Sequence, residues 1–203
     1  MALASAAPAK ASTPDEAVQA FVQQSIDHGI GIMKDKNLTD AERRTQVQDL
    51  LSQLLDTTKI GLFALGAARA TAGKTDLDDY VAAFKRFMIA SYVTRLDGYG
   101  GQSLKVTGVI DHAPGDFVVT SVLVDPDNPN DPDPVQVDFR VLDESGTFAV
   151  VDASIAGVWL GLAQRDDFVG FLGQHDNSVP ALTAHLKEMT AQFLAPKGAA
   201  SAP

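Results

Sequence analysis

The sequence contains no cysteine, only one tryptophan and few basic residues for its length of 203. The lack of cysteine excludes disulfides, thiolate catalysis and cysteine-based metal sites. Lys and Arg number 16 against 26 Asp and Glu, which gives a formal net charge of −10. This charge argues against nucleic acid as a partner and against electrostatic docking on anionic lipid, because both need a basic face. If the protein works at membranes, a partner protein with a basic surface is the more natural dock.

Long hydrophobic runs are also missing, since none reaches the ~18 residues that a membrane-spanning helix needs. The first segment, MALASAAPAKASTP, is rich in small residues, and Ala2–Ala4 would suit the end of a signal-peptide cleavage region. The basic and apolar regions of such a signal do not precede it. We expect either a secreted protein whose signal is absent from this sequence or a plain tail. Residues 1–12 and 196–203 lack periodic apolar patterns and are expected to be disordered tails.

The first half of the chain carries helical patterns. Capping boxes at Thr13–Glu16 and Thr39–Glu42 predict the starts of two helices, because apolar residues follow each box at helical spacing. Ile60–Ala68 is a short apolar segment that we expect to form a buried helix. Thr75–Asp78 predicts the start of the longest helix, which the stretch Tyr99–Gly101 would end.

From Leu104 onward the apolar period changes to two, and short turns separate the segments. Asp143–Gly146 is typical of a tight hairpin, and helical patterns return over Trp159–Leu172 and Val179–Leu194. Short connections between consecutive strands favour antiparallel pairing in sequential order. The sequence therefore predicts an α+β fold, with a single antiparallel sheet of four or more strands packed against helices on one face. The predicted strands are 104–110, 116–124, 135–142 and 147–155.

Two segments match binding motifs only in part. Ala68–Thr75 (ARATAGKT) nearly fits a phosphate-binding P-loop, but Ala68 replaces the first glycine and a helical segment precedes it instead of a strand. The loop Asp125–Pro134 (DPDNPNDPDP) has four Asp that could attract calcium, but it lacks the central Gly and the late Glu of an EF-hand. We interpret the first as a helix start and the second as an exposed hairpin loop.

Signatures of catalysis are weak. The four histidines, His28, His112, His175 and His185, lie far apart without metal-binding spacing, and no GxSxG elbow occurs. A Ser-His-Asp cluster could still assemble in space, so a hydrolase remains a weaker alternative.

The most prominent pattern is the apolar face of the segment Asp79–Gln102. Such a face is normally core. Its tyrosines have polar ends, which would also suit a partly hydrated surface. The pattern alone leaves open whether the face is solid core or the wall of a cavity for an apolar guest. At steps of four it carries Tyr80, Phe84, Met88, Tyr92 and Leu96.

Several motifs follow one another in the order of a known family. They are the Y-x-x-x-F of Tyr80–Phe84, the stretch Tyr99–Gln102, the strand Pro134–Arg140 (PVQVDFR), the D-x-x-x-x-G-V of Asp152–Val158, and Leu65-Gly66 and Leu182–Lys187. Their order and spacing resemble the MlaC family, the periplasmic lipid-binding component of a retrograde phospholipid transport system, also called toluene-tolerance proteins. The likeness covers roughly residues 14–194.

One residue departs from the family pattern, since Trp159 stands where the family often has Ser. The stretch Gln164–Phe168 is similar to the branch of the family associated with hopanoid biosynthesis. The resemblance therefore allows a hopanoid or other isoprenoid as the lipid, in place of a glycerophospholipid.

The resemblance implies a curved sheet against helices, with an apolar cavity that takes acyl chains and leaves the head group outside. Residues 13–195 would form a monomeric, periplasmic lipid-binding domain that shuttles lipid between membrane-anchored transport proteins of the inner and outer membranes. No catalysis, cofactor or metal is expected. The alternatives are an interaction subunit of an envelope complex, with a solid core, and a hydrolase of lipid-like esters. The residues expected to line the cavity are Phe84, Met88, Tyr92, Val106, Val118, Val137, Phe139, Trp159, Leu162 and Phe168.

Overall fold

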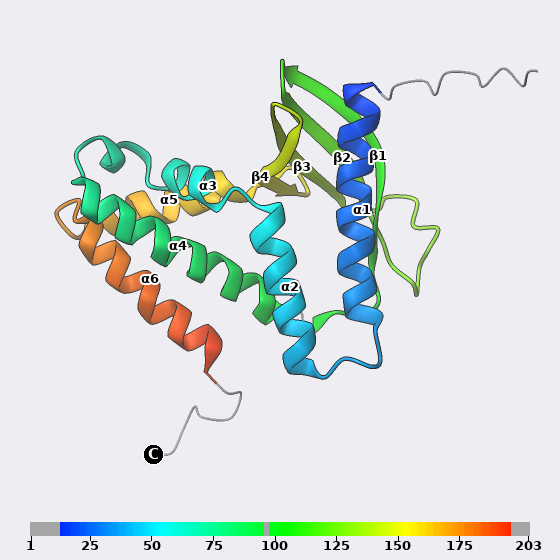
Figure 1. Ribbon diagram of the computed structural model, residues 1–203, viewed down its shortest axis with the longest axis horizontal. Helices are drawn as coiled ribbons and strands as arrows, with labels where there is room; N and C mark the ends of the chain where they lie inside the picture. The colour runs from blue at the N-terminus through cyan, green and yellow to red at the C-terminus, as the bar shows by residue number, and fades with distance from the viewer. Residues whose placement is uncertain (1–12, 96–97, 196–203) are drawn as a thin grey trace, which may run out of the picture.

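A computed structural model describes residues 13–95 and 98–195 of the chain. The segments 1–12 and 196–203, expected to be disordered tails, lie outside the described residues. Helices come first, then an antiparallel sheet, then two closing helices (Figure 1). The elements are α1 (Pro14–Lys34), α2 (Asp40–Leu54), α3 (Thr57–Ala64), the 3-10 helix η1 (Gly66–Ala70), α4 (Lys74–Arg95), β1 (Ser103–Ala113), β2 (Asp116–Val124), β3 (Gln136–Glu144), β4 (Thr147–Ile155), β5 (Val158–Trp159), α5 (Leu160–Gly173) and α6 (Val179–Leu194).

Both predicted capping boxes are present at the starts of α1 and α2. The Thr13 hydroxyl accepts the amide of Glu16 at 3.3 Å, and the Glu16 carboxylate accepts the amide of Thr13 at 2.9 Å. Thr39 and Glu42 repeat the arrangement at 3.2 and 2.8 Å. Each box satisfies backbone donors that a helix start otherwise leaves unpaired, so the sequence fixes where these two helices begin.

The sheet confirms the predicted α+β class and the predicted strand order. Its strands run β1-β2-β3-β4-β5, and all neighbouring pairs are antiparallel. The turn between β3 and β4 has positive φ at Ser145 (58°) and Gly146 (89°). Two positive φ values define the turn type whose twist matches antiparallel strands. The Asp143 carboxylate accepts the amide of Gly146 at 2.6 Å and closes this turn.

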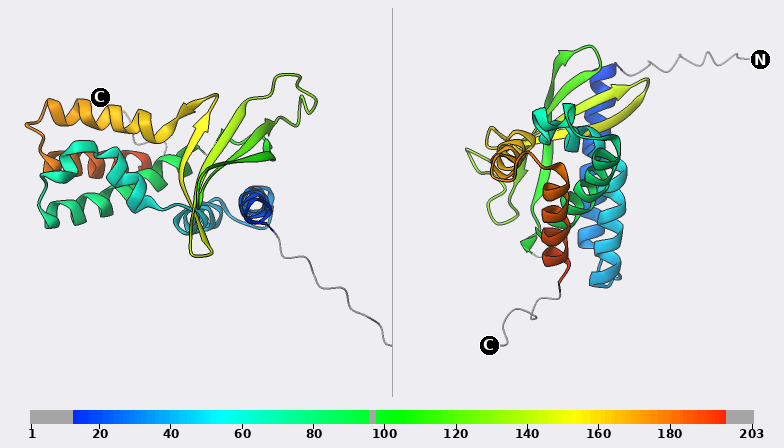
Figure 2. Two further views of the ribbon diagram at one scale, coloured as in Figure 1. Left: turned by 90° about the horizontal axis from the view of Figure 1, so that it is seen from above. Right: turned by 90° about the vertical axis from the view of Figure 1, so that its left-hand side faces the viewer.

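The helices fall into two groups, which differs from the expectation that all pack on one face of the sheet. Helix α1 lies along β1 and β2, and α2 runs beside it (Figure 1). Helices α3, α4, α5 and α6 pack mainly on one another beyond β4, as the view from above shows (Figure 2). Because this second group buries its apolar faces internally, it needs no face of the sheet.

The aromatic face of α4 forms the core of the second group. Tyr80 and Phe84 are almost fully buried, and the ring of Phe168 from α5 meets both edge-on, with centroids 6.3 and 6.0 Å away. The Tyr80 hydroxyl donates to the carbonyl of Gly61 in α3 at 2.9 Å. A Cβ at Gly61 would lie 2.7 Å from the Phe84 ring, so only glycine lets α3 approach α4 this closely. This face of α4 is therefore packed core around Tyr80 and Phe84.

A separate core lies between α1 and the sheet. Successive inward residues of β2, Phe117 and Val119, are buried together with Val141 of β3. Val18 and Val22 of α1 cover them from above. The alternation along β2 is the period-two pattern that the sequence displayed, with one face of the strand buried under α1.

Candidate functional site

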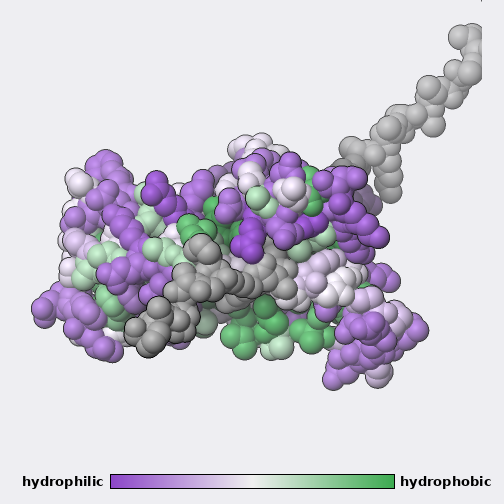
Figure 3. Space-filling view, turned by 90° about the horizontal axis from the view of Figure 1, so that it is seen from below, coloured by the Kyte–Doolittle hydropathy of each residue, from purple (hydrophilic) through white to green (hydrophobic). Residues whose placement is uncertain are grey.

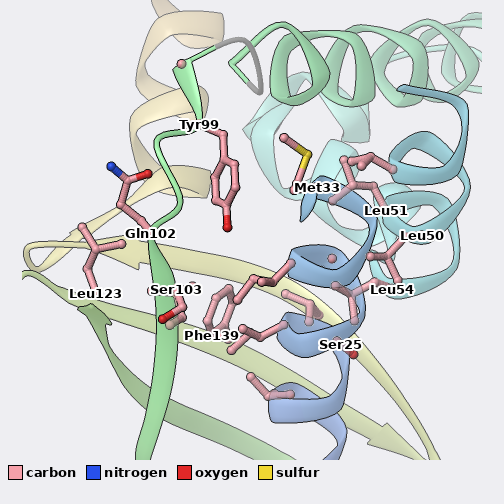
Figure 4. A pocket seen from close by; sticks show the side chains of 18 residues that line it. Ser25, Met33, Leu50, Leu51, Leu54, Tyr99, Gln102, Ser103, Leu123 and Phe139 are labelled. Atoms are coloured by element: carbon pink, nitrogen blue, oxygen red, sulfur yellow. The ribbon is translucent and has the colours of Figure 1, made fainter. Parts of the chain in front are cut away.

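A cavity of about 560 Å³ lies between α1, α2, the sheet and the segment that joins α4 to β1. Figure 4 shows side chains from these elements converging on one space. Helix α1 contributes an apolar stripe at helical spacing, and α2 contributes a second one. The lining residues are Val22, Ser25, Ile26, Gly29, Ile30, Met33, Val47, Leu50, Leu51, Leu54, Gly98, Tyr99, Gln102, Ser103, Leu104, Leu123, Phe139 and Val150.

Two separate hydrogen bonds to strand backbones hold α1 and α2 above the sheet. On the β1 side, the Gln23 side-chain oxygen of α1 accepts the amide of Val106 at 3.0 Å. On the β4 side, the amide of Asp56, just beyond α2, donates to the carbonyl of Val150 at 3.0 Å. The helices are thus tied to β1 and β4, and the two strands between these in the sheet, β2 and β3, pass beneath them. This attachment leaves space under the two apolar stripes.

The cavity wall has few polar groups, and most lie on one segment. Among the described lining residues there is no charged side chain. The Ser25 hydroxyl donates to the carbonyl of Phe21 at 2.8 Å, so α1 itself satisfies it. Tyr99, Gln102 and Ser103 come from the α4–β1 segment, and Figure 4 shows the Tyr99 hydroxyl directed into the cavity.

The Tyr99 hydroxyl is buried and has no hydrogen-bond partner among the residues that the structure describes. Burial raises the pKa of Tyr99 above its ordinary value of 10.0. The group therefore stays protonated at neutral pH and keeps its hydrogen available to an acceptor. The hydroxyl of Tyr80, in contrast, already donates its hydrogen to the carbonyl of Gly61 within the helical bundle.

Four of the residues expected to line the cavity lie instead on the helical bundle. Phe84 and Met88 of α4 and Phe168 of α5 are buried in the bundle core, and Tyr92 packs against that core partly buried. None of the four lines the cavity. The stripe of α4 is closed by α5 and α6, which place their own apolar residues over it.

The expected sheet residues divide between the two faces of the sheet. Phe139 of β3 lines the cavity. Val106 packs on the sheet core beside it, and Val137 shares the face of Phe139 but does not line the cavity. Val118 alternates with the buried Phe117 and Val119, which places its side chain on the opposite face.

The last two expected residues lie where β5 meets α5, also outside the cavity. Trp159 is partly buried at the N-terminal end of α5. Leu162 is 51% exposed, and Ile155 and Val158, which come shortly before it in the chain, are 45% and 60% exposed.

Seen from below, the molecule shows apolar residues near the middle of the face, with hydrophilic ones toward both ends (Figure 3).

Sequence reasoning missed most of the cavity wall. The lining stripe of α1 contains Ile26, Ile30 and Met33, and that of α2 contains Leu50 and Leu51. Both stripes were visible as helical periodicity, but periodicity has the same form whether a face meets packed core or empty space. The signal for Tyr99 is its place in the Tyr99–Gln102 motif of the family resemblance, whereas the stretch Tyr99–Gly101 by itself predicts only the end of a helix.

The segments with partial motifs have ordinary structural roles. Residues Ala68–Thr75 span η1 and the start of α4, and helix α3 precedes them where a P-loop needs a strand. In the loop after β2, the carboxylates of Asp125 and Asp131 accept the amides of Asp127 and Asp133, as in turns. Within the described residues, no group of three His, Asp or Glu could hold a metal ion.

Two histidines stack on the ring of Phe171. His175, between α5 and α6, lies with its ring centroid 3.9 Å from that of Phe171, and His185 of α6 stacks on the same ring at 4.6 Å.

Over residues 13–95 and 98–195, no helix combines the length and the apolar character that crossing a membrane requires.

Comparisons with known proteins agree with this architecture. A solved structure of a phospholipid-binding protein from Ralstonia solanacearum, in complex with a phospholipid, superimposes with a TM-score of 0.71. The two chains are 24% identical, and the match covers 87% of this chain and 98% of that one. Among curated proteins, none matches. The model of the MlaC protein family matches residues 23–188, which include α2 to α5 entire and every residue of the cavity wall except Val22. The chain belongs to the MlaC family.

Proposed function

We propose that this protein binds a phospholipid, with its acyl chains in the cavity between α1, α2 and the sheet and its head group outside. The observation that carries the proposal is the cavity itself, about 560 Å³ in volume and lined almost wholly by apolar side chains. Ligand sites in proteins typically measure about 300 to 1,000 Å³. The phospholipid bound to the Ralstonia solanacearum protein of similar fold supports the same class of ligand.

The energetics of acyl chains favour such a site. Burial is worth about 0.8 kcal/mol per methylene, so a sixteen-carbon chain gains on the order of 12 kcal/mol on leaving water. The apolar part of the cavity makes no hydrogen-bonding demand along the acyl chain. Met33 adds an adaptable thioether to the wall, which suits chains of variable length.

The protein acts, in this proposal, as a monomeric carrier in the periplasm, with residues 13–195 as one lipid-binding domain. It passes lipid between membrane-anchored transport proteins of the inner and outer membranes. Membership of the MlaC family supports this role. The net charge of −10 favours docking on partner proteins with basic surfaces over direct adsorption to anionic lipid.

A hopanoid or other isoprenoid is the second candidate ligand. The sequence feature that favours it is the stretch Gln164–Phe168 within α5. This stretch lies away from the wall of the cavity, so it gives less support than the cavity gives to acyl chains.

Binding without catalysis fits the wall better than hydrolysis does. The described lining residues include neither a histidine nor a carboxylate, which are the usual general bases. A purely interacting subunit would have no need for an empty apolar space of this size, because protein interiors are otherwise close-packed.

The test is extraction of the purified protein with organic solvent and mass spectrometry of the extract. We expect a near-stoichiometric phospholipid, and lipid-free protein should take up phospholipid from vesicles. A hopanoid mass would select the second ligand. Released fatty acid and lysophospholipid would indicate a hydrolase. A protein that neither carries lipid nor takes it up would be an interaction subunit, and the proposal would be wrong.

A further inference from the structure

The α4–β1 segment gives the cavity a polar wall that the acyl chains do not require. Tyr99, Gln102 and Ser103 are close in sequence and line the cavity together. The Gln102 side-chain oxygen accepts the amide of Gly100 at 2.8 Å, which folds this segment back on itself. Gly101 has a φ of +95°, a value that side-chain-bearing residues rarely adopt, and it turns the chain into β1. The segment therefore holds Tyr99 in place by its own local structure.

The Tyr99 hydroxyl is an anomaly in this setting. It is buried and faces the cavity, and within residues 13–95 and 98–195 it has no partner, although buried polar groups in proteins are normally hydrogen-bonded. By contrast, the Ser25 hydroxyl of α1, which also lies in the cavity wall, donates to the carbonyl of Phe21 and is satisfied. A group left unsatisfied at the edge of an apolar cavity is explained if the ligand brings the missing acceptor.

We propose that the Tyr99 hydroxyl donates a hydrogen bond to an oxygen of the bound lipid, at the junction of its acyl chains and head group. The acceptor is an oxygen of the glycerol ester or the phosphate, which share the capacity to accept from a neutral hydroxyl. Tyr99 thus makes the cavity discriminate between lipids with an acceptor at this position and plain hydrocarbons. The inference rests on the proposed phospholipid binding and adds a residue that sets specificity.

The lipid's own chemistry places the acceptor near this wall. A phospholipid changes from apolar to polar over the few atoms of its glycerol backbone. The cavity makes the same change, from the α1 and α2 stripes to the segment 99–103. Hydrogen-bonding sites reject analogues that lack the matching group, because the buried donor is then left unpaired.

The experiment compares wild type, Tyr99→Phe and Tyr92→Phe after removal of lipid. Tyr92→Phe is the matched control, since it deletes the same atom from an α4 tyrosine that does not line the cavity. Each protein is equilibrated with vesicles of diester phosphatidylcholine and with vesicles of the diether analogue, and bound lipid is measured by mass spectrometry. Each is also titrated with diphenylhexatriene, a fluorescent hydrocarbon that has no polar atom.

We expect Tyr99→Phe to weaken binding of the diester lipid about threefold to tenfold. Binding of diphenylhexatriene should not weaken, and Tyr92→Phe should match wild type with every ligand. If the ester carbonyl is the acceptor, the diether lipid, which lacks that carbonyl, binds wild type and Tyr99→Phe equally. If the phosphate is the acceptor, Tyr99→Phe weakens both lipids by the same factor.

Lipid-free Tyr99→Phe should melt at or above the temperature of wild type, because the change removes an unsatisfied buried group. The inference is overturned if wild type binds diester phosphatidylcholine and Tyr99→Phe binds it equally well. It is also overturned if Tyr99→Phe loses the hydrocarbon probe and the lipid to the same extent, which would make the hydroxyl structural. Failure of wild type itself to bind phosphatidylcholine would instead refute the proposed function.

Discussion

Asp152 of β4 accepts the backbone amide of Gly161, in the first turn of α5, at 2.9 Å. The residue at the start of α5, Trp159, provides no side-chain cap, so a strand residue supplies the acceptor that the helix needs. A Cβ at Gly161 would stand 2.9 Å from the Asp152 carboxylate, which explains the glycine. The D-x-x-x-x-G-V motif of Asp152–Val158 thus serves to join the sheet to the helical bundle.

Asp152→Ala should lower the free energy of unfolding by about 1–2 kcal/mol, because it leaves the Gly161 amide without its partner. The measurement is urea unfolding followed by circular dichroism. Asp152→Asn is the control, since its side-chain oxygen can still accept the bond, and it should lose less than Asp152→Ala. Equal losses for both variants would show that the charge matters more than the acceptor.

The pair Asp116 and Arg140 should make stability depend on pH. Two hydrogen bonds from Arg140, at 3.0 and 2.7 Å, hold the pKa of Asp116 below its ordinary value of 3.8. A lowered folded-state pKa contributes stability above the ordinary pKa, and this stability is lost as pH falls through the lowered value. Asp116→Asn should therefore lose up to about 1 kcal/mol at neutral pH, a value reduced by solvent screening of the half-exposed Arg140.

The difference between wild type and Asp116→Asn should shrink as pH falls below 4. Unfolding by urea at a series of pH values measures it. Asp133→Asn, at an exposed position of the β2–β3 loop, is the control and should follow wild type throughout. A difference that is constant with pH would mean that Asp116 acts by packing and not through its charge.

Replacing methionine by tryptophan at two positions, one in the cavity wall and one in the bundle core, should have opposite effects on lipid binding and on stability. Met33→Trp places an indole in the cavity, so bound lipid should fall while the free energy of unfolding changes by less than about 1 kcal/mol. Met88→Trp overfills the packed bundle, so it should lose about 1–3 kcal/mol and keep the wild-type lipid content per folded molecule. Thermal melts and lipid quantification on the same samples measure both effects. The reverse result would place the lipid along α4.

The elements of this fold were largely readable from the sequence. The capping boxes at Thr13 and Thr39 specify local hydrogen bonds between residues three apart, so no distant contact is needed to form them. The turn at Ser145 and Gly146 likewise sets the register of β3 against β4. Sequential strand order follows from short connections, because a short loop cannot carry the chain past a neighbouring strand.

The cavity could not be predicted in the same way. The stripes with Met88 and with Met33 are both apolar at helical spacing, yet the first is closed by α5 and α6 and the second faces open space. That outcome depends on where the helices are attached, through Gln23 to Val106 on β1 and through Asp56 to Val150 on β4. These partners lie far apart in sequence, and nothing in a local pattern records them.

The sequence by itself determined the helices, the strands, the order of the sheet and the family, because each depends on local patterns or on their order along the chain. The tertiary structure alone decided which apolar face became core, which became a cavity wall, and that Tyr99 directs an unpaired hydroxyl into that cavity. The physical reason is that periodicity shows a face must leave water, whereas only the distances between elements decide whether protein or a ligand covers it.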